Sequence, residues 1–186
     1  MNSASISKSR SASCRASPEP LHNSVAIRLP QALGDPMNKA FTREPDADGR
    51  VYCPRCRSLG IPVTTVTLDR HVKTQPRVGL GDSAWFCDFA RCDISYFDQF
   101  DRSVVVDELR SSIYPKDPEA PVCACFGFTL EDIDADVEQG TPTRIRELLA
   151  KSQSGDAQCQ TLAADGRCCM REVQRIYMKR LAELKD

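Results

Sequence analysis

The stretch from Val122 to Met170 is the part of this chain that says most about its fold. It opens as Val122-Cys123-Ala124-Cys125-Phe126-Gly127 and closes as Gly166-Arg167-Cys168-Cys169-Met170, with Cys159 between these two ends. Loop closure can bring two thiols from the first end, Cys159 and one thiol of the adjacent pair together. The spacing therefore predicts one site with four sulfur ligands.

A second set of cysteines precedes this stretch. Cys53-Pro54-Arg55-Cys56 has the C-x-x-C spacing by which a tight turn presents two sulfurs to one metal ion. Cys87 and Cys92 supply another pair. Together the four predict a tetrahedral zinc site, because a metal can clamp two hairpin-like pieces that share too little core to fold alone. His71 is a candidate spare ligand, although a surface position or a supporting hydrogen bond is the favoured role.

The composition supports small, metal-stabilised units. Among 186 residues there are ten cysteines, 41% apolar residues and only 6% aromatic residues, so one large core is hard to build. Lys and Arg number 25 against 26 Asp and Glu, which leaves no electrostatic footprint for nucleic acid. No apolar run approaches the roughly 18 residues of a membrane span, and no secretory signal is visible. We therefore expect a cytoplasmic protein whose cysteines bind metal, with disulfides as the alternative.

The predicted fold class is α+β, with three regions. Residues 1–50 are rich in Ser and Pro and are expected to form a disordered arm, in which Cys14 is a free thiol. Residues 51–120 are expected to form the β-rich zinc subdomain, with strands at 61–68, 94–97 and 104–106, a loop at 69–82 and a proline-rich extended linker at its end. Residues 121–186 are expected to form a helical subdomain, with helices that begin near Thr129, Thr141 and Met170.

The thiols of the helical subdomain suit a [2Fe–2S] cluster, in which each of two irons needs two thiolates. An extended C-x-C segment would place Cys123 and Cys125 on the same side of the chain. Cys159 and either Cys168 or Cys169 would supply the other pair. Backbone N–H groups at the start of the last helix would offset the negative charge of the cluster.

Several motifs in this order resemble a known family. The C-x-C motif, the gap to Cys159 and the helix-leading cysteine resemble the helix-turn-helix [2Fe–2S] fold of bacterioferritin-associated ferredoxins. Over about residues 51–180 the chain resembles the N-terminal domain of the archaeal copper chaperone CopZ family. The matching motifs are Cys53-Pro-x-Cys56, Phe86-Cys87 with Cys92 and Tyr96-Phe97, Pro121-Val122-Cys123-x-Cys125 and Gly166-Arg167-Cys168-Cys169.

This resemblance implies one mononuclear zinc and one [2Fe–2S] cluster. It also implies that the fourth cluster ligand is Cys169, ten residues after Cys159, with Cys168 as the alternative. The chain departs from the family in two places. It has no Met-x-Cys-x-x-Cys copper loop, which argues against direct copper delivery, and it has Ala164-Asp165 where Asn-Pro often stands.

The function expected from these features is one-electron transfer by an iron–sulfur protein with a structural zinc. The resemblance links it to the handling of copper or another heavy metal as a transient cargo, and its partner would be a redox or metal-transfer protein. No catalytic constellation is visible, so we expect a carrier rather than an enzyme, with metal-ion reduction as the activity left open. Two alternatives remain: a non-redox adaptor with zinc at both sites, and a metal or cluster sensor that docks through its Ser-rich arm or last helix.

Overall fold

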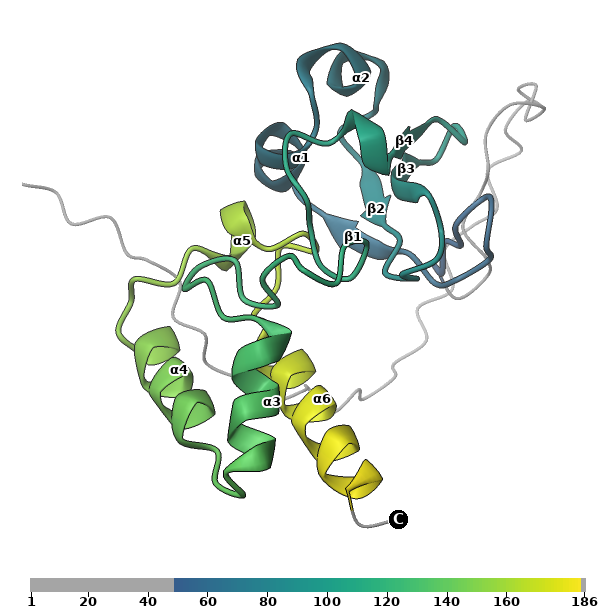
Figure 1. Cartoon of the computed structure of the whole chain (residues 1–186). Helices are drawn as coiled ribbons and strands as arrows, with labels where there is room; N and C mark the ends of the chain where they lie inside the picture. Colours follow the sequence, from purple (N-terminus) through teal and green to yellow (C-terminus); the bar gives the residue numbers. More distant parts are fainter. Residues whose placement is uncertain (1–48, 185–186) are drawn as a thin grey trace, which may run out of the picture.

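An antiparallel sheet forms the first half of the computed structural model and helices form the second half, which confirms the predicted α+β class (Figure 1). The structure describes residues 49–184. In chain order the elements are β1 (Ile61–Val63), α1 (Thr65–His71), α2 (Thr74–Gly79), β2 (Ala84–Phe86), β3 (Ile94–Asp98), β4 (Ser103–Val105), a 3-10 turn (Val106–Glu108), α3 (Leu130–Glu138), α4 (Thr143–Gln153), α5 (Cys159–Leu162) and α6 (Met170–Glu183).

The sheet has the strand order β1-β2-β3-β4, so each strand pairs with the next one along the chain. Its central strand β3 is buried along its whole length. Tyr96 and Phe97 are consecutive on β3 and are 0% and 1% exposed, which means that both faces of the sheet are covered. One face packs in a cluster of Leu68, Val72, Leu80, Ala84, Phe86, Tyr96, Val104, Leu109 and Ile113. The other packs in a cluster of Val51, Cys53, Cys87, Cys92, Ile94 and Phe97.

Two predictions about this half were wrong. The strand expected at 61–68 ends at Val63, and the next residues form helix α1. Thr67, Leu68 and His71 are the buried residues of α1, at the i, i+1 and i+4 spacing of one helix face. Burial of that face outweighs the β propensity of the threonines and valine. Helix α2 likewise occupies part of the expected loop at 69–82.

The segment expected to be an extended linker is instead a series of turns. The amide of Asp117 donates to the carbonyl of Ile113, and the amide of Ala120 donates to that of Asp117. Ala120 is buried, so these residues pack against the protein instead of spanning open space. The reason is a long-range contact that local sequence does not reveal: Lys116 Nζ donates to the carbonyls of Phe89 and Cys92.

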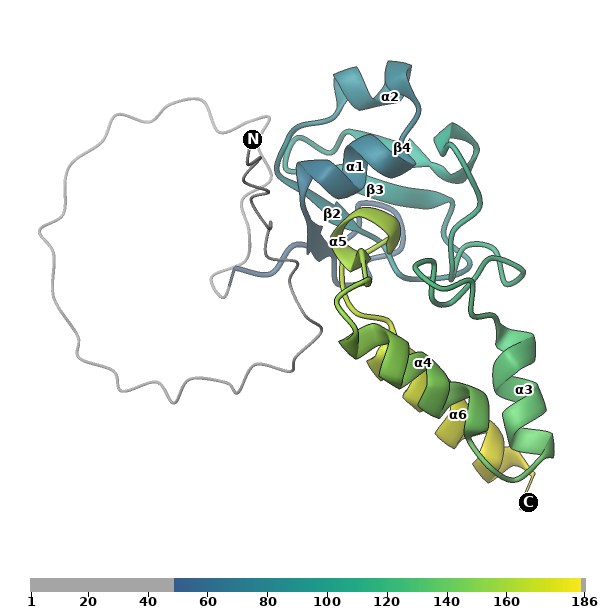
Figure 2. The same cartoon turned by 90° about the vertical axis from the view of Figure 1, so that its left-hand side faces the viewer.

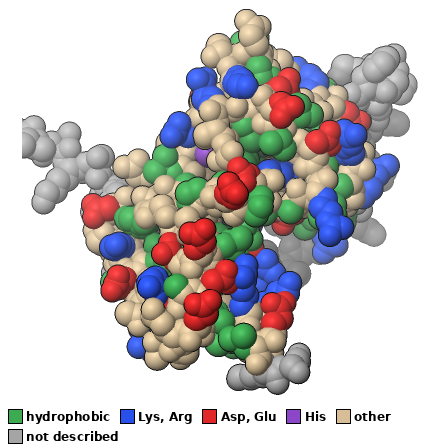
Figure 3. All heavy atoms as spheres, in the orientation of Figure 1, with side chains coloured by type: hydrophobic (Ala, Val, Ile, Leu, Met, Phe, Trp, Pro, Cys, Tyr) green, Lys and Arg blue, Asp and Glu red, His purple; other side chains and the backbone are tan. Residues whose placement is uncertain are grey.

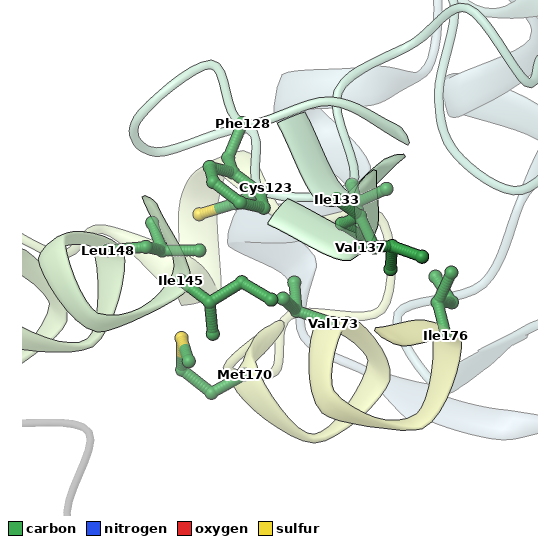
Figure 4. Close-up of a cluster of buried hydrophobic side chains, with 10 residues drawn as sticks. Cys123, Phe128, Ile133, Val137, Ile145, Leu148, Met170, Val173 and Ile176 are labelled. Carbon is green, nitrogen blue, oxygen red and sulfur yellow. The ribbon is translucent and has the colours of Figure 1, made fainter. Parts of the chain in front are cut away.

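The three predicted helices of the second half are confirmed as α3, α4 and α6. Thr129 caps α3 reciprocally with Asp132, each accepting a hydrogen bond from the other's backbone amide. The helices bury one apolar cluster, part of which is shown in Figure 4: Val122, Cys123, Phe128, Ile133, Val137, Ile145, Leu148, Met170, Val173 and Ile176. The short helix α5 was not predicted.

The predictions for residues 1–48, including the disordered arm and the free thiol of Cys14, lie outside the described residues. Among the helices that the structure describes, none is long and apolar enough to cross a membrane. Acidic and basic side chains are interspersed over the face of the molecule shown in Figure 3.

Asp136 joins α3 to α4 through a buried carboxylate. It is 0% exposed and accepts hydrogen bonds from the amides of Arg144 (3.1 Å) and Ile145 (2.9 Å), and from Arg144 Nη1 (3.2 Å). These amides belong to the first turn of α4, where no partner exists within the helix. The carboxylate therefore acts as the cap of α4 from a neighbouring helix.

We predict that Asp136→Ala lowers the free energy of unfolding by about 2–3 kcal/mol, because it leaves buried donors without their charged acceptor. Urea unfolding of the zinc-loaded protein, followed by circular dichroism, would measure the change. Glu138→Ala, at an exposed position of the same helix, should shift stability by no more than about 0.5 kcal/mol. Equal effects of the two substitutions would contradict this role of Asp136.

Candidate functional site

Four of the predicted zinc ligands come together in the first half of the chain. The sulfurs of Cys53, Cys56, Cys87 and Cys92 all lie within 4.8 Å of one another. Two separations are 3.9 Å, between Cys53 and Cys92, and 3.5 Å, between Cys56 and Cys87. A tetrahedral zinc with ordinary zinc–sulfur bonds requires sulfurs about 3.8 Å apart. The donor set and its spacing therefore fit one zinc ion.

Local hydrogen bonds shape the loops that present these sulfurs. In the first loop the carbonyl of Cys53 accepts from the amide of Arg57 (3.1 Å), and the amide of Cys53 donates to Ser58 (2.8 Å). Arg57 adopts a left-handed conformation, with φ of 63°, which reverses the chain. In the second loop the amide of Cys87 donates to Ser95, and that of Cys92 donates to Phe89. The pair Cys53–Cys56 and the pair Cys87–Cys92 thus each lie in a closed turn, as their short spacing predicts.

The thiols of Cys53, Cys56 and Cys92 differ in how easily they ionise. Burial raises the pKa of Cys53 and raises that of Cys92 to about 12. Burial also opposes ionisation of Cys56, but hydrogen bonds from the side chain and backbone of Ser58 outweigh it and lower the pKa of Cys56 to about 6. Hydrogen bonding to Ser58 thus favours the thiolate form of Cys56, and zinc binding would displace the protons that the buried thiols of Cys53 and Cys92 retain.

Two residues near this group were missed in the sequence analysis. Ser58 Oγ lies 3.0 Å from the sulfur of Cys56 and 3.3 Å from that of Cys87. Its position two residues after Cys56, inside the turn, was a usable signal, because serine hydroxyls in turns bond to nearby groups. The ammonium group of Lys116 donates a hydrogen bond to the carbonyl of Cys92 over 3.1 Å. Its positive charge would offset the excess negative charge of four thiolates around one zinc ion. No local signal identified Lys116.

His71 lies elsewhere. It is 5% exposed, its ring stacks near Tyr96 with centroids 6.5 Å apart, and its Nε2 has no hydrogen-bond partner. It is not part of the group of four sulfurs. Burial lowers the pKa of His71, so the neutral ring is favoured. The expectation of a surface position was wrong: His71 is a buried residue of α1, and its ring lies beside that of Tyr96 on β3.

The second group of cysteines consists of Cys123, Cys125, Cys159 and Cys169, whose thiol groups lie close to one another. The sulfurs of Cys125 and Cys159 lie 3.8 Å apart. Cys123 hydrogen-bonds to Cys169 and also to Cys125, and the bond from Cys169 is the main reason why the pKa of Cys123 falls to about 6. The same contact, with burial, raises the pKa of Cys169. Cys123, Cys125, Cys159 and Cys169 therefore lie in one connected group of thiols.

The backbone around Cys123 corrects one expectation. Cys123 and Phe128 exchange two backbone hydrogen bonds, 3.0 and 3.2 Å long, so the C-x-C motif lies in a closed turn rather than in an extended strand. Gly127 completes that turn with φ of 66°, a conformation that favours glycine. The turn, and not strand alternation, brings Cys125 back toward Cys123.

The ends of two helices supply the remaining thiols. Cys159 is the first residue of α5, and Cys169 is the N-cap of α6. Cys168 precedes it and is close enough for its charge to raise the pKa of Cys169. None of the nine cysteines in residues 49–184 forms a disulfide. The sulfurs of both groups are thus in the thiol form that can act as metal ligands.

We predict that Cys53→Ser and Cys87→Ser each lose most of the bound zinc and lower stability, because metal binding and folding are linked in a unit with such small cores. Zinc analysis and thermal unfolding of freshly purified protein would measure both effects. Cys168→Ser should keep about one zinc per chain. Normal zinc content and stability in the Cys53 or Cys87 variant would refute the assignment.

Comparisons with known proteins agree with this geometry. Residues 50–110 match a family of the CopZ type that is described as a zinc binding domain. Among solved structures, the chain is similar to the X-ray structure of the Archaeoglobus fulgidus CopZ N-terminal domain, with 22% sequence identity and a TM-score of 0.56. The alignment covers 68% of this chain and 97% of that domain. No curated protein matches the sequence significantly. Residues 50–110 are therefore similar to the zinc-binding domain of the CopZ type, and the chain shares the fold of the CopZ N-terminal domain.

Proposed function

We propose that this protein is a one-electron carrier that combines a structural zinc with a [2Fe–2S] cluster. Cys53, Cys56, Cys87 and Cys92 would hold the zinc, and Cys123, Cys125, Cys159 and Cys169 would hold the cluster. The observation that carries the proposal is the connected group of four thiols at the start of α6, in which the sulfurs of Cys125 and Cys159 lie 3.8 Å apart.

The shape of the second group supports a cluster over a single ion. A tetrahedral ion needs all four sulfurs at one point, as in the first group. Within residues 49–184, the group from Cys53 to Cys92 meets that condition and the second group does not. A two-iron cluster instead takes its thiolates as two separated pairs. Four neighbouring thiols that do not all meet at one point are compatible with such a division.

The surroundings of the second group suit a charged, redox-active occupant. When bound, a [2Fe–2S] cluster would supply the one-electron chemistry. The chain's own residues shield one side, because Cys123 is 2% exposed within the apolar cluster of Figure 4. Helix α6 begins at the site, and its first N–H groups favour negative charge. Cys125, Cys159 and Cys169 are only partly buried, so a partner protein can approach from their side.

The likeness to the CopZ domain suggests a role in metal-ion handling, with copper or another heavy metal as substrate or cargo. The chain lacks a Met-x-Cys-x-x-Cys copper loop. We therefore place its role in electron supply for a metal-handling partner rather than in carrying copper on such a loop.

Anaerobic purification of the full chain tests the proposal. We expect about two irons per chain, visible charge-transfer bands and an EPR signal after one-electron reduction. Reconstitution with iron and sulfide under argon is the second arm, in case the cluster is lost during isolation. Colourless protein that carries zinc alone in both arms would contradict the proposal and favour zinc at both sites.

Two neighbouring substitutions test the ligand assignment. Cys169→Ser should shift or bleach the visible bands and leave zinc near one per chain, because it removes a cluster ligand without touching the first group. Cys168→Ser is the matched control and should retain the bands. The reverse result would assign the fourth ligand to Cys168.

A further inference from the structure

The segment between Cys159 and Cys169 packs against the half of the molecule that contains the first cysteine group. Figures 1 and 2 show α5 beside α1, and the two helices are in contact. α5 and α1 are far apart in the sequence and belong to different halves of the fold. The position of Cys159, the first residue of α5, thus depends on contacts with the first half.

Two side-chain hydrogen bonds make this attachment specific. Thr67 Oγ1, on α1, donates to the carbonyl of Gln160 over 2.7 Å. The hydroxyl of Tyr96, on β3, donates to the carbonyl of Ala164 over 2.8 Å. Thr67 and Tyr96 are both 0% exposed. Burial raises the pKa of Tyr96, so its hydroxyl stays protonated and remains a donor.

Apolar packing and close approach add to these bonds. Ala164 packs against the cluster of buried residues on the α1 side of the sheet. Gly166 has φ of 69°, and a Cβ at this position would lie 3.0 Å from Thr67 Oγ1. The backbone of residues 160–166 therefore packs closely against α1 and β3. A side chain at position 166 would be disfavoured both by this close contact and by the positive φ.

Tyr96 is also tied to the zinc loops. The residue before it, Ser95, accepts a hydrogen bond from the amide of Cys87 over 2.9 Å. Cys87 and Cys92 lie at the turn between β2 and β3, which a zinc ion would hold together with Cys53 and Cys56. Loss of zinc would release this turn and, with it, the strand that positions the Tyr96 hydroxyl.

We propose that the zinc-loaded half positions the second group of cysteines, with Thr67 and Tyr96 as the positioning residues. They hold residues 160–164 in place and so determine where Cys159 stands relative to Cys123, Cys125 and Cys169, which pack in or against the helical core. The second site is consequently assembled only in the zinc-loaded chain. The proposal extends the proposed function, since it makes zinc binding a condition for cluster binding, but its test requires no cluster.

Hydrogen exchange of the full chain, zinc-loaded and free of iron, provides that test. The amides of Thr161, Leu162, Ala163 and Gly166 are hydrogen-bonded within the segment. A helix as short as α5 does not persist alone in water, so protection of these amides reports the tertiary attachment. We expect Tyr96→Phe and Thr67→Val each to speed their exchange by roughly tenfold, which corresponds to one buried hydrogen bond.

Matched controls separate this effect from a general loss of stability. Tyr177→Phe changes a tyrosine of the helical core, and Thr65→Val changes a neighbouring position on α1. Both should leave exchange in the segment unchanged, and all four variants should keep the zinc. Exchange of the α4 and α6 amides should stay the same throughout, because these helices have a core of their own.

Zinc removal by a chelator is the second arm, and it does not depend on the folding of any variant. We expect the amides of residues 161–166 to lose protection while those of α4 keep it. Unchanged protection after zinc removal, or equal exchange in the variants and their controls, would overturn the proposal. A chain that passes this test and never binds iron would refute the proposed function alone. A cluster that forms equally well without zinc would refute the positioning role alone.

Discussion

The meeting of four sulfurs at one point is the constraint on which the first half of this molecule depends. Cys53, Cys87 and Cys92 are part of the cluster that covers one face of the sheet, where they occupy the place of ordinary core residues. That cluster is small, and its remaining apolar members cannot by themselves hold two turns together. A metal at this point neutralises the thiolates and joins the turns, so ligation replaces the apolar surface that the chain does not have.

The same constraint extends to the second half through the sheet. Tyr96 and Phe97 project to opposite faces of β3: Phe97 contacts the cluster that contains the zinc cysteines, and Tyr96 reaches the segment that follows α5. One strand thus borders both groups of thiols. The halves are built differently, as a sheet and as a set of helices, yet residues 160–166 of the helical half complete the packing of the sheet. The resulting arrangement places two cysteine sites in one molecule with a defined path of contacts between them.

The two sites also differ in their physical character in ways that fit different occupants. The first is a closed group with every sulfur near every other, which suits a single ion with no exchangeable position. The second is a less tightly gathered group of thiols at the start of α6, buried at Cys123 and partly exposed at Cys125 and Cys159. A site of that kind combines shielding with access, and electron transfer to a partner requires both. The functional proposal rests on this contrast together with the likeness to the CopZ domain.

What the sequence by itself determined is the chemistry: the two cysteine sets, the tight turn at Cys53–Cys56, the amphipathic helices α3, α4 and α6, and the strands β3 and β4. These features are local, because ligand spacing, helix caps and strand composition act within a few residues. Only the tertiary structure decided that 65–71 is a helix, that the proline-rich segment folds back as turns, and that the C-x-C motif is a closed turn. It alone revealed Lys116 beside Cys92 and the hydroxyls of Thr67 and Tyr96 on the segment after Cys159. These outcomes depend on burial against residues far away in the chain, and no local pattern encodes such contacts.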